Sequence, residues 1–205
     1  MSQLALPLVG GDDADPSLRI IIGPANQAVA KALSDPAAWP FHTAVLTGPP
    51  RSGKTLLGRW FAYAHPSAQV IDGADALPQA EVFHAWNRAQ ESGTPLLLIP
   101  DAASWTVALP DLRSRLSAAL HLAISEPDDA LLSALLELHA GRRRLVLGES
   151  AATYLVPRIE RSYAAAERIV AEIDRISLER KLPPARSIWR EALEAVQGPS
   201  QGRLL

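Results

Sequence analysis

Cysteine is absent from this 205-residue sequence, and its absence removes several kinds of chemistry. Without thiols the chain has neither a disulfide framework nor a cysteine nucleophile. The five histidines do not fall at metal-ligand spacings, and no Ser/His/Asp arrangement indicates nucleophilic catalysis. A sequence without cysteine suits a reducing compartment, so we expect a cytoplasmic protein.

Long hydrophobic runs and a strong net charge are also lacking. The apolar run LLLI at residues 96–99 is far too short to span a bilayer, and the N-terminus lacks the pattern of a signal peptide. We therefore expect no membrane attachment. The formal net charge is −2, so bulk charge does not recruit the protein to nucleic acid.

The residues that are present fit an ordered globular protein. Hydrophobic residues make up 48% of the chain, and the mean hydropathy is +0.04, which is too apolar for a disordered chain. A chain of this length holds one good core, or one domain with a small appendage.

Short apolar stretches alternate with helical patterns in the first part of the chain. Strands are predicted at residues 43–48, 69–72, 94–100 and 119–124, and helices from about residue 26, at 54–64 and at 79–93. From residue 127 onward the strong patterns are all helical, at about 128–140, 149–156, 160–181 and 186–196. This order predicts an α/β nucleotide-binding layer followed by an all-helical subdomain.

The segment GPPRSGKT at residues 48–55 matches the full pattern of a phosphate-binding loop and lies between a predicted strand and a predicted helix. Gly48 and Gly53 allow a tight turn whose N–H groups face phosphates, Lys54 would neutralise the β and γ phosphates, and Thr55 would bind Mg²⁺. A glycine turn with a solvent-exposed lysine is the simpler alternative. The predicted nucleotide-binding residues are Gly48, Pro49, Pro50, Arg51, Ser52, Gly53, Lys54, Thr55 and Leu56.

Four segments together resemble the DnaA/Hda branch of bacterial AAA+ proteins. They are IIIGPANQAV (20–29), the phosphate loop, FHAWN (83–87) and LPDLRSRL (109–116), and their order and separation are more specific than any one of them. YLVPRIERSYAAAERIVAEID then falls where this family has its lid helices. The resemblance runs from about residue 20 to the C-terminus. It implies a P-loop AAA+ parallel sheet flanked by helices, followed by a small all-helical lid subdomain.

Within this branch the chain is similar to the Hda-type regulators, which inactivate the replication initiator DnaA. DnaA carries a C-terminal helix-turn-helix domain, and nothing is left for one after about residue 197. We therefore expect no direct sequence-specific DNA binding. The implied organisation is a flexible clamp-binding segment and linker at residues 1–18, an AAA+ subdomain at 19–126, a lid at 127–197 and a flexible tail at 198–205.

The resemblance also gives a meaning to QLALPL at residues 3–8. Hda-type proteins begin with such a segment, which binds the sliding clamp, the β subunit of DNA polymerase III. The predicted clamp-binding residues are Gln3, Leu4, Leu6, Pro7 and Leu8. In such recognition an extended segment places apolar side chains in pockets and a glutamine amide forms hydrogen bonds. The alternative is an edge strand that packs on the body of the protein.

The resemblance assigns a catalytic role to Arg115, which matches the arginine that the family inserts into the nucleotide site of a neighbouring molecule. A guanidinium suits this role because its fixed charge and fork geometry stabilise charge on a transferred phosphoryl group. The alternative is a solvated arginine at the start of a strand. Arg113, two residues away, is a helper or a surface charge.

The acidic residues depart from the family pattern. Asp72 follows an apolar stretch where the magnesium-binding aspartate is expected, and Asp75 is the second choice. The segment between the phosphate-loop helix and FHAWN is short, with one predicted strand instead of two. If the surviving strand is not the one that carries the acid, no magnesium acid remains. Asp101 stands where relatives sense the γ-phosphate, and it is either a residue that orients water or an ordinary loop aspartate.

Two further positions bear on nucleotide sensing. Asn26 lies near the expected adenine side and either contacts the base or caps a helix. The lid arginine that usually touches nucleotide is replaced by Ala164.

The implied function is negative regulation of replication initiation. The chain would bind ADP or ATP, with Mg²⁺, and stimulate hydrolysis of DnaA-bound ATP, while being a poor ATPase on its own. Its expected partners are the sliding clamp and DnaA, and the resemblance also allows a homodimer. The alternative function is a non-catalytic clamp-binding adaptor with a degenerate AAA+ body.

Overall fold

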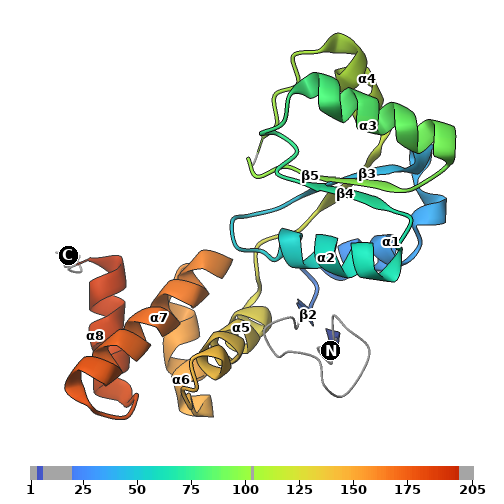
Figure 1. The fold of residues 1–205 in the computed structure, drawn as a ribbon. Helices are drawn as coiled ribbons and strands as arrows, with labels where there is room; N and C mark the ends of the chain where they lie inside the picture. The colour runs from blue at the N-terminus through green and yellow to red at the C-terminus, as the bar shows by residue number, and fades with distance from the viewer. Residues whose placement is uncertain (1–3, 7–19, 103, 199–205) are drawn as a thin grey trace. The chain divides into compact units, whose positions relative to one another are not determined.

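The computed structural model describes residues 4–6, 20–102 and 104–198, with only the backbone described for residues 4–6 and 149. The chain divides into two compact units, residues 1–125 and 126–205 (Figure 1). The first unit is an α/β layer and the second is helical.

A four-stranded parallel sheet forms the centre of the first unit. Its strands are β3 (Thr43–Thr47), β4 (Gln69–Asp72), β5 (Leu96–Ile99) and β6 (Leu120–Ala123), in the spatial order β4-β5-β3-β6. All three neighbouring pairs are parallel. Such a sheet needs cover on both faces, which explains the continuous apolar runs in β3 and β5. The predicted parallel sheet is confirmed.

Helices cover both faces of this sheet (Figure 1). The helices α1 (Gln27–Ser34) and α2 (Lys54–Ala64) lie on one face, and α3 (Gln79–Ser92) and α4 (Pro110–Ala118) lie on the other. Gly58 brings α2 close to the sheet, because a Cβ at this position would lie 2.6 Å from Cδ1 of Ile99. Two short 3-10 helices, Pro36–Ala38 and Pro40–His42, connect α1 to β3.

The core of this unit follows the alternation of side chains along β5. Leu96 and Leu98 belong to a cluster with Val82 of α3 and Leu112 of α4. Ile99 points to the opposite face, towards α2. Each of these side chains is fully buried and contributes about 1.5–3 kcal/mol to folding.

The segment around Arg115 is helical. Helix α4 begins with Pro110 at its first position, where the missing N–H of proline costs nothing. Arg115 lies in its last turn, and β6 begins only at Leu120. The interpretation of Arg115 as the start of a strand is therefore wrong.

Part of the N-terminal segment pairs with the body of the chain. Strand β1 (Leu4–Leu6) is antiparallel to β2 (Ile20–Ile22), with Leu4 opposite Ile22 and Leu6 opposite Ile20. The backbone of residues 4–6 thus pairs with β2, as the edge-strand alternative expects, while the division into a flexible segment at residues 1–18 stays a prediction. Gln3, Pro7 and Leu8 lie outside the described residues.

The second unit packs four helices. They are α5 (Asp129–Arg142), α6 (Glu149–Leu155), α7 (Tyr163–Arg180) and α8 (Arg186–Gln197), with a 3-10 turn at Val156–Arg158 after α6. The Asp128 carboxylate caps α5 by accepting the Leu131 N–H at 2.7 Å, and the Ser162 hydroxyl caps α7 by accepting the Ala165 N–H at 3.1 Å. Helix α7 supplies the centre of the core with residues such as Ile169 and Ile173.

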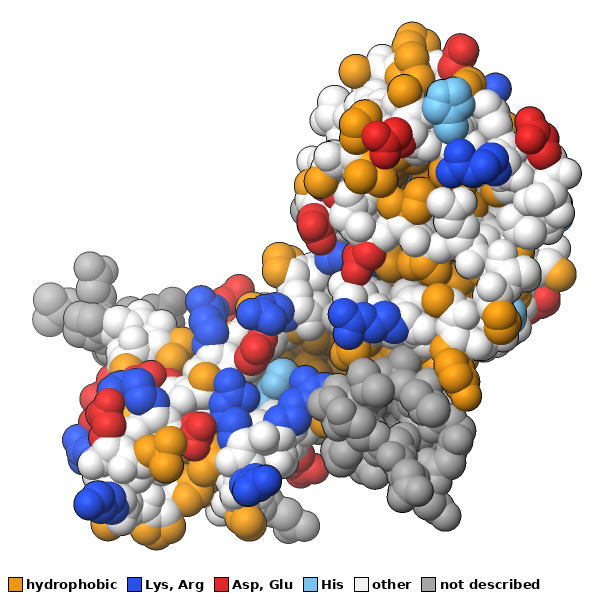
Figure 2. Space-filling model, viewed as in Figure 1, with side chains coloured by type: hydrophobic (Ala, Val, Ile, Leu, Met, Phe, Trp, Pro, Cys, Tyr) orange, Lys and Arg blue, Asp and Glu red, His pale blue; other side chains and the backbone are white. Residues whose placement is uncertain are grey.

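The described part of the chain contains no helix that is long and apolar enough to cross a membrane. On the face shown in Figure 2, basic and acidic side chains are interspersed among the coloured residues.

Candidate nucleotide-binding site

The loop between β3 and α2 has the backbone shape that phosphate binding requires. Gly53 is the N-cap of α2 with φ +89°, and Arg51 has φ +65°. Left-handed residues alternating with right-handed ones turn successive N–H groups towards the same side, and the adjoining helix N-terminus adds partial positive charge. A left-handed φ is why position 53 favours glycine.

The start of the loop is pressed against the end of β6. A Cβ on Gly48 would lie 2.8 Å from Cβ of Ile124 and 3.1 Å from Oγ of Ser52, so no larger residue fits here without a shift. Ser52 is only 7% exposed, and its Oγ has no hydrogen-bond partner in the described structure. A buried hydroxyl without a partner fits a loop that receives a hydrogen-bonding ligand.

Lys54 places its charge inside the loop. Its Nζ donates hydrogen bonds to the Gly48 carbonyl at 2.9 Å and to the Pro49 carbonyl at 3.3 Å. The ammonium therefore bridges the beginning of the loop and the beginning of α2. Thr55 follows in the first turn with an exposed side chain, and Leu56 is half-buried. The predicted loop residues thus form one continuous cradle with a cation inside it.

Two exposed carboxylates lie where β4 and β5 end. Asp72 is the last residue of β4 and is exposed, and Asp101 follows β5 and is also exposed. Gly73 connects them: its N–H donates to the Ile99 carbonyl at 2.9 Å, and a Cβ on it would lie 3.8 Å from Oδ2 of Asp101. Because β3, β4 and β5 run parallel, their carboxyl ends lie at one edge of the sheet, and this edge also carries the phosphate loop.

Asp75 is the carboxylate with the most defined contacts. Its Oδ1 accepts the Asp101 N–H at 2.7 Å and its Oδ2 accepts the Ala102 N–H at 2.9 Å. Partial burial opposes its ionisation, but the hydrogen bonds from Ala102 and Asp101, and the charge of Lys54, hold the pKa of Asp75 below its usual value. Asp75 therefore orders the loop after β5 and responds to the charge of the phosphate loop.

These acids do not form a metal site by themselves. No group of three metal-ligating side chains lies together among the described residues. Mg²⁺ commonly binds through one or two carboxylates together with substrate phosphates and water, so Thr55 with Asp72 or Asp75 fits a site that a nucleotide completes. One strand, β4, is described between α2 and α3, and it pairs directly with β5. This pairing places Asp72 opposite Ile99, at the end of β5.

Asn26 has a different local role from helix capping. It is 4% exposed, its Oδ1 accepts the Gly23 N–H at 2.9 Å, and its Nδ2 donates to the Ile21 carbonyl at 2.9 Å. It occupies the N-cap position of α1 but forms no side-chain cap hydrogen bond with that helix. Asn26 therefore fixes the turn between β2 and α1, and contact with adenine stays a prediction.

Arg115 lies against α3. Its guanidinium donates to the Asn87 side-chain oxygen, and its Cζ lies 4.2 Å from the Phe83 ring centre and 4.4 Å from the Trp86 ring centre. All three partners belong to the FHAWN segment, for which the sequence suggested no role. Their spacing of three and four residues, which places them on one face of a helix, is the pattern that points to a shared contact.

Arg113 has a structural contact of its own. Its Nε donates to the Val107 carbonyl at 2.8 Å, and its Nη2 approaches the Ala108 carbonyl at 3.4 Å. It fixes the loop that leads into α4.

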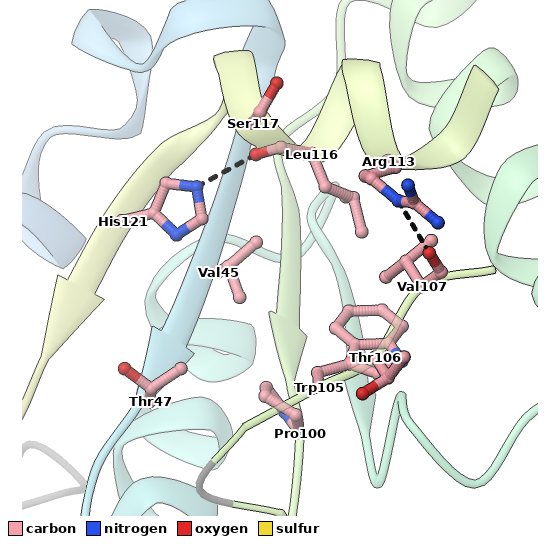
Figure 3. Close-up of a pocket in the computed structure, with 10 residues that line it drawn as sticks. All are labelled: Val45, Thr47, Pro100, Trp105, Thr106, Val107, Arg113, Leu116, Ser117 and His121. Atoms are coloured by element: carbon pink, nitrogen blue, oxygen red, sulfur yellow. Dashed lines mark hydrogen bonds between the residues drawn. The ribbon is translucent and has the colours of Figure 1, made fainter. Parts of the chain in front are cut away.

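A cavity of about 470 Å³ lies beside Arg113, between the sheet and α4 (Figure 3). It is lined by Val45, Thr47, Pro100, Trp105, Thr106, Val107, Arg113, Leu116, Ser117 and His121. One side is fixed by the hydrogen bond between Nε2 of His121 and the Leu116 carbonyl, 2.9 Å long. The walls are mostly apolar, so the cavity suits an apolar group. The sequence did not indicate it, because its walls come from separate strands, a loop and a helix.

Comparison with known proteins rests on structure alone. No protein-family description matches the chain, and no curated protein matches it in sequence. Domain III of the replication initiation protein DnaA from Thermotoga maritima superimposes with a TM-score of 0.72 at 13% identity, over 88% of this chain and 95% of that one. The chain has an AAA+ fold.

Other AAA+ structures support the same conclusion. A structure of DnaA bound to AMPPCP and single-stranded DNA gives a TM-score of 0.60 at 17% identity, over 79% of this chain and 66% of that one. The Holliday junction branch migration motor RuvB of Thermotoga maritima gives 0.62 at 16% identity, over 85% and 70%. The sheet with its phosphate loop and the following helical unit are thus features of a shared AAA+ architecture.

Proposed function

We propose that this chain is an adenine-nucleotide-binding AAA+ protein that regulates replication initiation in the manner of Hda. Attached to the sliding clamp, it would stimulate hydrolysis of ATP bound to DnaA and so return DnaA to its inactive ADP form. The observation that carries the proposal is the phosphate loop at residues 48–55, with the Lys54 ammonium held inside it, in a chain with the fold of DnaA domain III.

The chain's own nucleotide would be structural. Residues 48–56 would hold the phosphates of ADP or ATP, with Lys54 as the cation. Thr55 would be the magnesium ligand, with Asp72 as the first acidic candidate. Asp101 would orient a water molecule. Mg²⁺ would supply charge neutralisation between the phosphates.

Arg115 would act in trans on ATP held by DnaA. A guanidinium is always charged and forms paired hydrogen bonds to phosphate oxygens, so it stabilises the charge that develops during phosphoryl transfer. In the free chain its donors face Asn87 and two aromatic rings. Acting on a partner therefore requires the side chain to leave α3 when the partner docks.

Clamp attachment would use Gln3, Leu4, Leu6, Pro7 and Leu8 as an extended peptide in an apolar groove. The described β1–β2 pairing covers only three residues on each strand, and so short a ladder is weakly stable. Clamp binding would exchange this ladder for the groove. A cytoplasmic location and a homodimer belong to the same proposal.

A second candidate is a non-catalytic clamp-binding adaptor. Two observations favour it. Asp75 is engaged by backbone N–H groups rather than directed at a ligand, and only one strand is described between α2 and α3. In this case nucleotide binding would only stabilise the fold.

Turnover of DnaA-bound ATP separates the two candidates. We would preload DnaA with labelled ATP and follow hydrolysis with this protein alone, with clamp on DNA alone, and with both. A regulator accelerates hydrolysis only when both are present. An adaptor binds the clamp and leaves the hydrolysis rate unchanged, which would refute the regulatory proposal.

A further inference from the structure

The helical unit contains a cavity that is separate from the phosphate loop. Its volume is about 670 Å³, and it is lined by Ser150, Thr153, Tyr154, Arg158, Arg186 and Trp189. We propose that this cavity binds a phosphate group, either as the free ion or on a small ligand. The proposal goes beyond the function proposed above and does not depend on it.

Two arginines converge on one tyrosine in this cavity. The Cζ of Arg158 lies 4.4 Å from the Tyr154 ring centre, and the Cζ of Arg186 lies 4.9 Å from the same centre. Both guanidiniums therefore lie against the same aromatic ring. Arg158 donates one hydrogen bond to the Tyr154 carbonyl, at 2.8 Å. Both arginines are exposed, and no ion pair joins either of them to a carboxylate within the described residues, so an anion at this point would meet two cations that have no ionic partner.

Arg186 also breaks a local rule of helix formation. It is the first residue of α8, a helix of 12 residues whose first turn has no acidic residue and whose N-cap makes no side-chain hydrogen bond. Helix N-termini favour negative charge, so a cation at this position is unfavourable for the isolated helix. Residues that disfavour the local structure in which they lie are often found at functional sites. An oxyanion at this N-terminus would turn the conflict into an attraction.

Trp189 forms one wall of the same cavity. It lies three residues after Arg186, on the same side of α8. Only 7% of it is exposed, and its indole Nε1 is enclosed by protein atoms without a hydrogen-bond partner in the described structure. Trp189 therefore reports on the cavity through the position of its ring and does not itself donate to a ligand.

These donors fit a phosphate group best. Two guanidiniums and the Ser150 hydroxyl supply several donors around one site, and phosphate offers more acceptor oxygens than a carboxylate. Arginine is also the side chain best suited to paired hydrogen bonds with phosphate oxygens. The site holds no described carboxylate that would repel an anion.

The direct test is a phosphate titration of the full chain, observed at the tryptophan indole N–H resonances by NMR. Five tryptophans give five resonances, and Trp189→Phe identifies the one that matters. At constant ionic strength, inorganic phosphate should shift the Trp189 resonance, whereas chloride should not. An ADP titration forms a second arm: a shift of Trp189 with ADP as well as phosphate would identify nucleotide phosphates as a further source of the ligand.

Variants make the test specific. Arg158→Gln and Arg186→Gln should each weaken phosphate binding about tenfold or more, because each removes charge-assisted hydrogen bonds. Arg168→Gln is the matched control, since Arg168 is an exposed arginine of the same unit that pairs with Glu160 outside the cavity, and it should leave the affinity unchanged.

Stability supplies a separate readout. Arg186→Gln removes an unfavourable cation from a helix N-terminus and also its contact with the Tyr154 ring, so the readout is the rise in melting temperature on adding phosphate, which should be present in the wild type and absent in the variant. The proposal is overturned if phosphate leaves the Trp189 resonance in place, or if both arginine variants bind phosphate as well as the wild type.

Discussion

Replacing Arg115 with alanine should destabilise the α/β unit, because the free chain holds this guanidinium against α3. The side chain makes one hydrogen bond to Asn87 and lies over two aromatic rings. A hydrogen bond from a charged donor contributes about 1.5–3 kcal/mol. Each cation–π contact at a partly exposed site adds about 0.5–1 kcal/mol. Since Arg115 is only half-buried, we expect a loss near the lower end of the sum, about 2.5 kcal/mol in total.

Urea unfolding followed by tryptophan fluorescence measures this loss directly. A double-mutant cycle with Asn87→Ala isolates the hydrogen bond, and we expect a coupling energy of about 1 kcal/mol. Arg88→Ala is the matched control: Arg88 is an exposed arginine of α3, next to Asn87, so its change should stay within about 0.5 kcal/mol.

The reasoning would be refuted if Arg115→Ala unfolds at the same urea concentration as the wild type. In that case the contacts with Phe83, Trp86 and Asn87 do not stabilise the fold. The Arg115 side chain could then reach a partner without a loss of stability.

Three further outcomes are expected. Lys54→Ala should abolish binding of ADP and ATP in calorimetry while leaving clamp binding intact; loss of both in a folded variant would mean that residues 3–8 depend on the nucleotide site. Asp75 has a pKa below its ordinary value of 3.8, so its stabilising effect should be complete above that value and be lost as the pH falls through the lower folded pKa. The difference in unfolding free energy between wild type and Asp75→Asn should therefore be large at pH 7 and shrink below about pH 4, and a difference that stays constant with pH would contradict this. Replacing both Leu6 and Leu8 with alanine should lower clamp affinity by about two to four decades in surface plasmon resonance, since each buried aliphatic anchor contributes about 1.5–3 kcal/mol; unchanged affinity together with a lower melting temperature would make the segment purely structural.

The sheet could be predicted from the sequence because its strands are short, rich in apolar residues and separated mostly by helices. LLLI at 96–99 is buried on both faces, and such runs are typical of parallel strands. The phosphate loop was equally readable, since Gly48 and Gly53 stand where space and a left-handed backbone require glycine. In both cases the residues that determine the local structure lie within one short segment of the sequence.

Other features depend on contacts between distant segments. Helix α4 was not recognised because its nine residues carry little helical periodicity, and its position is set by burial of Leu112 and Leu116. The contact between Arg115 and FHAWN spans 28 residues, and only the folded chain brings the two together. The pairing of residues 4–6 with β2 was one of two open alternatives, because an apolar extended segment suits both an edge strand and a peptide groove.

The central claim is that Arg115 of this chain acts on ATP held by DnaA. It is tested most directly by single-turnover hydrolysis of DnaA-bound ATP in the presence of clamp-loaded wild type, Arg115→Ala or Arg115→Lys. An arginine that contacts the transferred phosphoryl group contributes about 10³-fold or more, so both variants should lose nearly all stimulation while still binding the clamp. Stimulation by Arg115→Ala equal to that of the wild type would contradict the claim.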